Sequence, residues 1–134
     1  TQLIQTARKV NLDKTNWVVS QIRHSAETFG ELVGRPPKLA LFGLAYKPNV
    51  ADLRESPAVE IARILQKKGY VILCVEPHVE HFDGLDLVSA DNACEQADIG
   101  VILVKHDNFS TLGTKLERCD ISLDFCGLLE KLQR

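Results

Sequence analysis

The stretch that decides the fold is KLALFGLAYKPNVADLRESPAVEIARIL, residues 38–65. Its first part, residues 38–45, is short and apolar and is flanked by proline and glycine, which is typical of a strand covered on both faces. Ser56 and Pro57 then form a helix start, because serine is a common N-cap and proline suits the first helical position. Apolar residues recur at helical spacing until Gly69 stops the pattern. The stretch therefore predicts a buried strand, a charged loop and a helix.

The same alternation of helices and strands extends along the whole chain. An amphipathic helix from Leu3 to Val33, closed by Gly34, precedes the first strand. Further strands are expected at residues 70–77, 98–106 and 119–127, and further helices near residues 91–97 and 108–116. Buried strands separated by helices favour a parallel sheet with right-handed crossovers. We therefore expect an α/β fold, a three-layer Rossmann-like open parallel sheet with helices on both faces, preceded by an N-terminal helix.

Composition excludes several classes of function. The chain has 134 residues, with 16 Lys and Arg against 18 Asp and Glu in mixed order, so no basic footprint for nucleic acid is present. No apolar run approaches the roughly 18 residues that cross a membrane, and the N-terminus lacks a signal-peptide pattern. The four cysteines lack metal-type spacing and are expected to be free thiols in a reducing, cytoplasmic location. The start at Thr1 and the lack of methionine indicate an excised fragment.

The loop after the first strand carries Lys47, Asp52 and Arg54. In open α/β sheets, ligands bind beyond the carboxyl ends of the strands, and this loop begins at such an end. Two cations beside a helix N-terminus suit a phosphate group, and Asp52 could orient Arg54. The alternative is a solvated loop with a local ion pair, and spacing alone does not separate the two. Gly43 begins no G-x-G-x-x-G motif, so a complete dinucleotide site is not expected here.

Residues 76–81 contain two further candidates, each with a structural alternative. Glu76 could bind a cofactor ribose, but a strand end before a proline turn is the favoured interpretation. Glu76, His78, Glu80 and His81 could suggest a metal ion, but solvated loop histidines are favoured because no second cluster supports a metal site.

Two other strand ends carry reactive side chains. Cys126 could be a nucleophile, but no histidine lies near it in sequence, so a packed thiol is favoured. His106 and Asp107 could line the ligand cleft, with capping of the next helix as the alternative.

Two motifs carry a resemblance to a known family. FGLAYKPNVADLRESPA, residues 42–58, resembles the K-x-x-x-x-D-x-R-x-S stretch that opens the C-terminal domain of the UDP-glucose and GDP-mannose dehydrogenase family. TARKVNLDKTNWVV, residues 6–19, resembles the AR-x-x-N segment of the helix that links the family's central and C-terminal domains. The variant LRESPAVEIARIL, with VEPHV after the second strand, looks most like the UDP-N-acetyl-D-mannosamine dehydrogenase branch.

The resemblance implies a nucleotide-sugar 6-dehydrogenase that uses two NAD+ to oxidise a sugar hydroxymethyl group to a carboxylate. It implies that residues 1–34 are the C-terminal part of the linking helix and that residues 35–134 are the UDP-sugar-binding domain. The family's main NAD domain and its catalytic cysteine in a G-G-x-C motif have no counterpart here, so the isolated fragment is expected to be inactive. The missing domains of the same chain are expected partners, and the full-length protein is expected to be a homodimer.

The resemblance also assigns roles to residues of the loop. Tyr46 and Lys47 would contact the UDP-sugar, and Arg54 would reach NAD+. Asp52 and Ser56 would shape the loop and the helix entry, and no catalytic or metal-ligating residue is implied. The family often has a basic residue after its last strand, where LDFCG has Cys126, so one nucleotide contact departs from the pattern. A stand-alone nucleotide-binding or regulatory α/β module without catalysis is the alternative.

Overall fold

The computed structural model describes residues 2–109 and 112–126, with the backbone alone for residues 2–13 and 112. Its elements, in chain order, are the helix α1 (Gln2–Val33), the strand β1 (Lys38–Phe42), α2 (Pro57–Lys67), β2 (Val71–Val75), α3 (Ala90–Gln96), β3 (Ile99–Ile102), the short 3-10 helix η1 (Asp107–Phe109), α4 (Leu112–Leu116) and β4 (Ile121–Asp124). The predicted alternation of helices and strands is confirmed. The helix predicted near residues 108–116 corresponds to two short elements, η1 and α4.

The four strands form one parallel sheet in the order β2-β1-β3-β4. In the register of the sheet, Leu41 of β1 lies beside Cys74 of β2 on one side and Val101 of β3 on the other. The chain passes from β1 to β2 and then returns across β1 to β3. The order therefore reverses between β1 and β3, and their carboxyl ends define a topological switch point.

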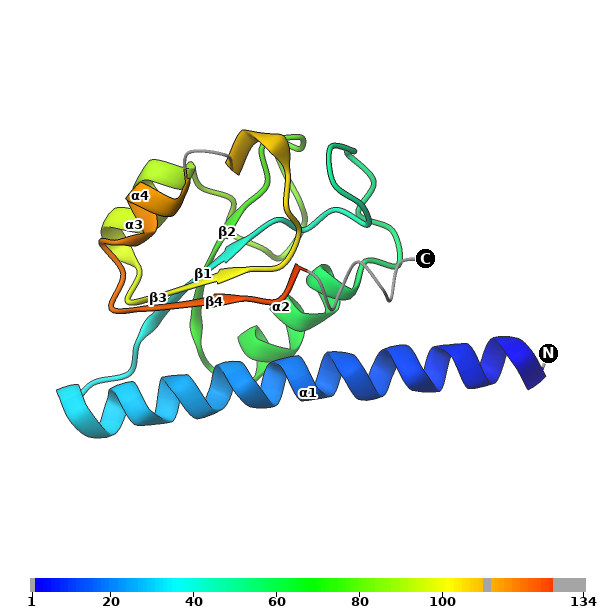
Figure 1. Cartoon of the computed structure of the whole chain (residues 1–134), viewed down its shortest axis with the longest axis horizontal. Helices are drawn as coiled ribbons and strands as arrows, with labels where there is room; N and C mark the ends of the chain where they lie inside the picture. Colours follow the sequence, from blue (N-terminus) through cyan, green and yellow to red (C-terminus); the bar gives the residue numbers. More distant parts are fainter. Residues whose placement is uncertain (1, 110–111, 127–134) are drawn as a thin grey trace.

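Helices cover both faces of the sheet, as expected for three layers (Figure 1). Along β1 the side chains alternate between two cores, since Leu39 and Leu41 pack with α1 and α2 whereas Ala40 and Phe42 pack with α3 and α4. Within the sheet, most of the fully buried residues belong to the central strands β1 and β3. The edge strand β4 alternates between half-buried and exposed residues, so the prediction that every strand is buried on both faces is wrong for β4.

The ends of β1 and α2 show why these elements stop. Gly43 has a φ of +94° and turns the chain out of the sheet, and a Cβ at this position would lie 2.6 Å from Val104 Cβ. At the far end of α2, Gly69 has the same positive φ and closes the helix, as predicted. Ser56 and Pro57 start α2 as predicted, but the Ser56 side chain forms no capping hydrogen bond. Its hydroxyl is used inside the preceding loop.

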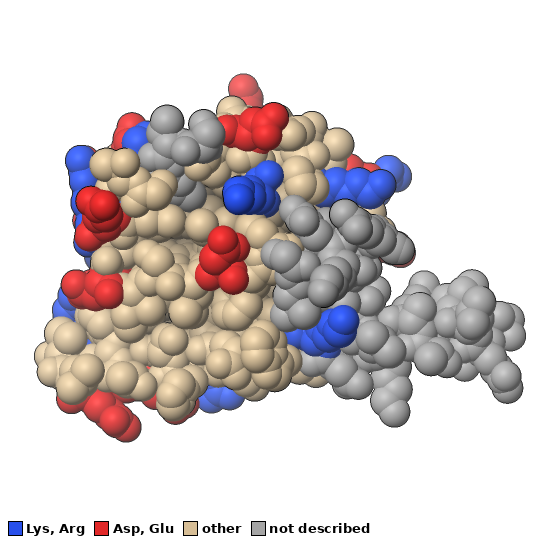
Figure 2. Space-filling model, viewed as in Figure 1, with Lys and Arg blue, Asp and Glu red and all other residues tan. Residues whose placement is uncertain are grey.

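Positive and negative side chains are interspersed on the face shown in Figure 2, and neither sign forms a continuous field there. This agrees with the mixed charge order along the sequence. Within residues 2–109 and 112–126, no helix combines the length and apolar composition needed to cross a membrane.

Candidate functional site

The loop of residues 43–56 leaves β1 at the switch point and returns to α2 beside the carboxyl end of β2. Two short contacts close it on itself. The backbone N–H of Tyr46 donates to the carbonyl oxygen of Asp52 at 2.6 Å. The Ser56 hydroxyl, which is buried, donates to the carbonyl oxygen of Leu44 at 2.6 Å. Ser56 therefore joins the end of the loop to its beginning.

Tyr46 and Lys47 lie side by side on the outer part of this loop. The Lys47 Nζ lies 5.9 Å from the centre of the Tyr46 ring, within range of a cation–π contact. Tyr46 is half-buried, whereas Lys47 is exposed and forms no ion pair with residues that the structure describes. An exposed ammonium group beyond the carboxyl ends of parallel strands, with no ion pair to a described residue, suits an anionic ligand.

Arg54 lies on the same loop and is held by Asp52. The Asp52 carboxylate accepts hydrogen bonds from Arg54 Nε at 3.1 Å, from its terminal nitrogen at 3.2 Å and from its backbone N–H at 3.0 Å. These bonds hold the pKa of the Asp52 carboxyl below its usual value. The Arg54 side chain is nevertheless 89% exposed, so its position is fixed at one side and open to a ligand at the other.

Two shallow hollows meet at Arg54. One, of about 410 Å³, is lined by Tyr46, Asp52, Arg54 and Glu55. The other, of about 430 Å³, shares Asp52 and Arg54 and is closed by the apolar side chains Val79 and Phe82, among others. The loop thus has polar and apolar surfaces within reach of one guanidinium group.

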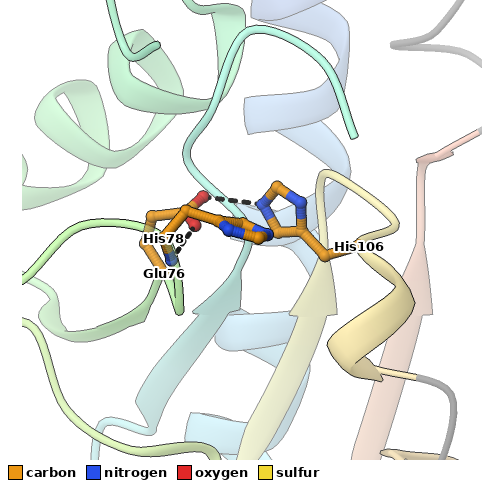
Figure 3. Close-up of side chains that lie close together, drawn as sticks. All are labelled: Glu76, His78 and His106. Atoms are coloured by element: carbon orange, nitrogen blue, oxygen red, sulfur yellow. Dashed lines mark hydrogen bonds and ion pairs between the residues drawn. The ribbon is translucent and has the colours of Figure 1, made fainter. Parts of the chain in front are cut away.

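Glu76, at the end of β2, is the centre of a buried hydrogen-bond network (Figure 3). Its Oε1 accepts hydrogen bonds from the backbone N–H groups of Leu44 and Ala45, each at 3.0 Å, and from His106 Nε2 at 2.8 Å. Its Oε2 accepts from the backbone N–H of His78 at 3.0 Å. Three of these four bonds join the end of β2 to the segments that follow β1 and β3, and the bond from His78 is local. The carboxylate therefore fixes these segments and has no exposed surface for a ribose.

Two opposing effects set the ionisation of Glu76. Burial by itself would raise the pKa of the carboxyl, because charge is poorly stabilised away from water. The hydrogen bonds from His106, His78 and Leu44 outweigh burial and lower the pKa below its usual value. Glu76 is therefore ionised and fully hydrogen-bonded at neutral pH.

His106 connects this network to the middle of the loop. Its side chain is fully buried, and its Nδ1 lies 2.8 Å from the backbone N–H of Asn49. The Asn49 side-chain oxygen in turn accepts from the backbone N–H of Asp107 at 2.8 Å. His106 therefore does not line an open cleft, and Asp107 begins η1.

The residues that could hold a metal ion in the structure differ from the set that the sequence suggested. In the described part of the chain, Glu76, His78 and His106 bring one ligand atom each within 4.8 Å of one another, whereas Glu80 and His81 are exposed outside this group. Because His106 Nδ1 accepts the Asn49 N–H, the ring proton is on Nε2, which points at Glu76. With the ring bonded in this way, neither nitrogen has a lone pair for a metal ion.

The four cysteines are free, as predicted, and all four are buried, which was predicted only for Cys126. Burial raises the pKa of the Cys74 thiol to about 12 and that of Cys119 to about 11, so neither is activated as a thiolate. Cys126 follows β4 and is also buried, with its Sγ 3.9 Å from the carbonyl oxygen of Ile102. Buried thiols of this kind act as small apolar side chains that pack in the core.

An open parallel sheet with a charged loop at its switch point is typical of α/β domains of the nucleotide-binding class. Residues 40–130 match the UDP binding domain of the UDP-glucose/GDP-mannose dehydrogenase family, and the chain belongs to that family. The family expected from the loop motif is therefore confirmed.

Relatives named for two N-acetylated sugars align with most of the chain. It is 39% identical to the NDP-N-acetyl-D-galactosaminuronic acid dehydrogenase of Ralstonia solanacearum over 95% of this chain and 30% of the relative. It is 42% identical to the UDP-N-acetyl-D-mannosamine dehydrogenase of Salmonella typhi over 83% of this chain and 29% of the relative. The chain thus spans about 30% of the length of these curated relatives.

Comparison with a solved structure supports the assignment of the fold. The UDP-N-acetyl-mannosamine dehydrogenase Cap5O from Staphylococcus aureus superposes with a TM-score of 0.75 at 28% identity. The match covers 92% of this chain and 29% of the Cap5O chain. The Rossmann-like fold and the N-terminal helix are therefore shared with a dehydrogenase of this family.

Sequence reasoning located the loop but missed the residue at its centre. Asn49 adopts a φ of +62°, in the left-handed region that asparagine tolerates better than most residues. The sequence Lys-Pro-Asn is a turn signal that could have indicated this conformation. No local signal indicated its bond to His106, because 57 positions separate the two residues.

Proposed function

We propose that this chain holds the UDP part of a UDP-sugar in a nucleotide-sugar dehydrogenase. Lys47 and Tyr46 contact the nucleotide sugar, with Lys47 near the diphosphate and the sugar. Asp52 and Ser56 keep the loop in the conformation that presents them. The observation that carries the proposal is the exposed ammonium group of Lys47, which forms no ion pair within residues 2–109 and 112–126, on a closed loop at the switch point.

The chemistry of a diphosphate fits this loop. Charge-assisted hydrogen bonds from Lys or Arg to phosphate oxygens are short and strong compared with neutral ones. Holding the diphosphate also fixes the attached sugar, so that its reacting carbon stays near groups on other domains. The contribution of this chain is therefore positioning, and none of its cysteines acts as the catalytic nucleophile.

The substrate we propose is UDP-N-acetyl-D-mannosamine, which is oxidised to UDP-N-acetyl-D-mannosaminuronate. Motif similarity and the relative from Salmonella typhi support this choice. The relative from Ralstonia solanacearum, whose name refers to an N-acetylated galactose derivative, supports an N-acetyl-D-galactosamine nucleotide as the second candidate. An N-acetylated hexosamine is common to both candidates.

Two NAD+ molecules, bound one after the other, would each accept one hydride in this reaction. Arg54 is the residue of this chain that we expect to face NAD+, because its guanidinium is exposed and braced by Asp52. The main NAD site and the catalytic cysteine belong to the domains that precede this one, so the isolated chain is inactive.

The remaining proposals concern the whole protein. Residues 1–34 form the end of the linking helix, residues 35–134 form the UDP-sugar domain, and the full-length protein is a homodimer. Its four free, buried thiols support a cytoplasmic location, where thiols stay reduced.

A matched pair of lysine variants tests the proposed site. In the full-length protein, Lys47→Ala is expected to weaken UDP binding and raise the KM for the UDP-sugar by about tenfold, because a charge-assisted contact is lost. Lys67→Ala removes another exposed lysine, at the end of α2 away from the loop, and is expected to change neither value. Calorimetry with UDP and steady-state kinetics give the two readouts.

Two results would overturn the proposal. Equal UDP affinity in Lys47→Ala and Lys67→Ala would remove Lys47 from the site. UDP binding without oxidation of any UDP-N-acetylhexosamine would favour the alternative, a nucleotide-binding or regulatory module without catalysis.

A further inference from the structure

The buried pair of Glu76 and His106 lies directly beneath the loop that carries Tyr46 and Lys47. Figure 3 shows the two side chains facing each other across the switch point, from the end of β2 and from the segment after β3. Both are fully buried, and neither is exposed to a ligand. Their effect on the site must therefore pass through the backbone.

The bonds of this pair hold the loop at two points. Glu76 accepts the N–H groups of Leu44 and Ala45, which start the loop. His106 accepts the N–H of Asn49, in its middle. Residues 46–48 lie between these points, so Tyr46 and Lys47 occupy a short span whose two ends are both fixed.

Only one arrangement of protons satisfies all of these bonds. A neutral imidazole donates through one nitrogen and accepts through the other. Since the Asn49 N–H must be accepted at Nδ1, the proton is on Nε2 and is donated to Glu76 at 2.8 Å. The carboxylate thus selects the tautomer of His106 that can accept the Asn49 N–H. In functional histidines generally, the hydrogen bond made by one ring nitrogen sets the protonation of the other.

We propose that His106 is a positioning residue for the UDP-sugar site, where it holds the backbone of Asn49 and thereby sets the place of Lys47. The inference rests on the proposed function, because it assigns a support to that site. Asn49 adds a second link, since its side chain accepts the N–H of Asp107 and joins the loop after β1 to the segment after β3. Asn49, with a φ of +62°, is thus bonded to two consecutive residues, His106 and Asp107.

Two variants of His106 separate its two hydrogen bonds. In His106→Asn, the side-chain oxygen is attached to Cγ, as Nδ1 is in histidine, so it can still accept the Asn49 N–H. In His106→Gln, the amide reaches toward Glu76 and leaves the Asn49 N–H without its acceptor. Full-length His106→Gln is expected to bind UDP about tenfold more weakly than the wild type, and His106→Asn within about threefold of it.

Uridine distinguishes positioning from a general loss of structure. Uridine lacks the diphosphate, so displacement of Lys47 is expected to leave its affinity unchanged in His106→Gln, whereas partial unfolding would weaken both ligands equally. In a double-mutant cycle, adding His106→Gln to Lys47→Ala is expected to cost no further UDP affinity, because both changes remove the same contact.

The outcomes separate this inference from the proposed function. If the wild-type protein binds no UDP, both fail. If the wild type binds UDP and His106→Gln binds it equally well, or loses uridine and UDP affinity in equal measure, only the positioning role fails. Loss of UDP affinity confined to the diphosphate, with retention in His106→Asn, supports it.

Discussion

Asp52 binds Arg54 through both of its carboxylate oxygens, at 3.1 Å to Nε and 3.2 Å to a terminal nitrogen, although only one residue separates them in the chain. The same carboxylate accepts the Arg54 backbone N–H at 3.0 Å. Exposed ion pairs contribute little to stability, so the effect of this pair is to restrict where the guanidinium can lie. An arginine held in this way can meet a second anion with less loss of conformational freedom.

The first prediction therefore concerns the cofactor. Arg54→Ala in the full-length protein is expected to raise the KM for NAD+ by about tenfold, and Asp52→Asn by about threefold, since the second change only loosens the guanidinium. Arg118→Ala is the control, because Arg118 forms an exposed pair with Glu95 away from the loop. Steady-state kinetics with varied NAD+ provide the measurement. If Arg54→Ala and Asp52→Asn have the same KM for NAD+ as Arg118→Ala, Arg54 does not contact the cofactor.

The second prediction concerns the closure of the loop. Ser56→Ala removes the buried hydroxyl that donates to the carbonyl oxygens of Leu44 and Ala45. Leaving buried acceptors without this donor is expected to lower the free energy of unfolding by about 1 to 3 kcal/mol. Urea unfolding followed by circular dichroism measures the change.

Ser122→Ala is the matched control for Ser56→Ala. Ser122 is exposed on the edge strand β4, so its loss is expected to change stability by no more than about 0.5 kcal/mol. Equal effects of the two substitutions would show that the Ser56 hydroxyl does not stabilise the loop.

The order of elements was predictable because it depends on local patterns. Apolar runs bounded by Gly and Pro marked the strands, and the Ser56–Pro57 pair marked the start of α2. The exposed face of β4 was missed, although apolar and polar residues alternate along Ile121–Asp124, which is a local sign of a half-buried strand. The place of β4 at the edge of the sheet was not predictable from such patterns. Strand order depends on contacts between distant segments.

The candidate site also has one part that was predictable from local sequence and one part that was not. The charged loop could be found from the sequence, because its motif is contiguous and follows a strand. The network beneath it could not, since Glu76 and His106 are separated by 30 positions and each had a plausible local explanation. The hydroxyl of Ser56 illustrates the same limit: its position predicted a cap, whereas the fold uses it to join two ends of a loop.

The third prediction follows from the lowered pKa of Glu76. A carboxyl whose folded-state pKa lies below its ordinary value of 4.5 adds stability that is complete above that value and is lost as the pH falls through it toward the folded-state pKa. Glu76→Gln is therefore expected to be less stable than the wild type at pH 7. The difference is expected to narrow below about pH 4.5.

Unfolding free energies measured across this acidic range give the result. Glu117→Gln, which removes an exposed carboxylate after α4, controls for the loss of one charge. A constant difference between Glu76→Gln and the wild type at every pH would contradict the role assigned to the ionised carboxylate.

The last prediction separates backbone strain from steric overlap where the loop begins. Gly43→Ala places a Cβ at a φ of +94° and 2.6 Å from both the Cβ and the carbonyl oxygen of Val104, so both costs apply. A loss of about 2 to 4 kcal/mol in unfolding free energy is expected. Gly84→Ala has a similar φ of +82° but no atom within 4 Å of the added Cβ, so only strain of about 1 to 2 kcal/mol is expected. Because Val104 belongs to the segment that leads to His106, Gly43→Ala is also expected to weaken UDP binding, whereas Gly84→Ala is not. Equal losses of stability in the two variants would show that the close approach of β1 to Val104 adds nothing beyond the backbone conformation.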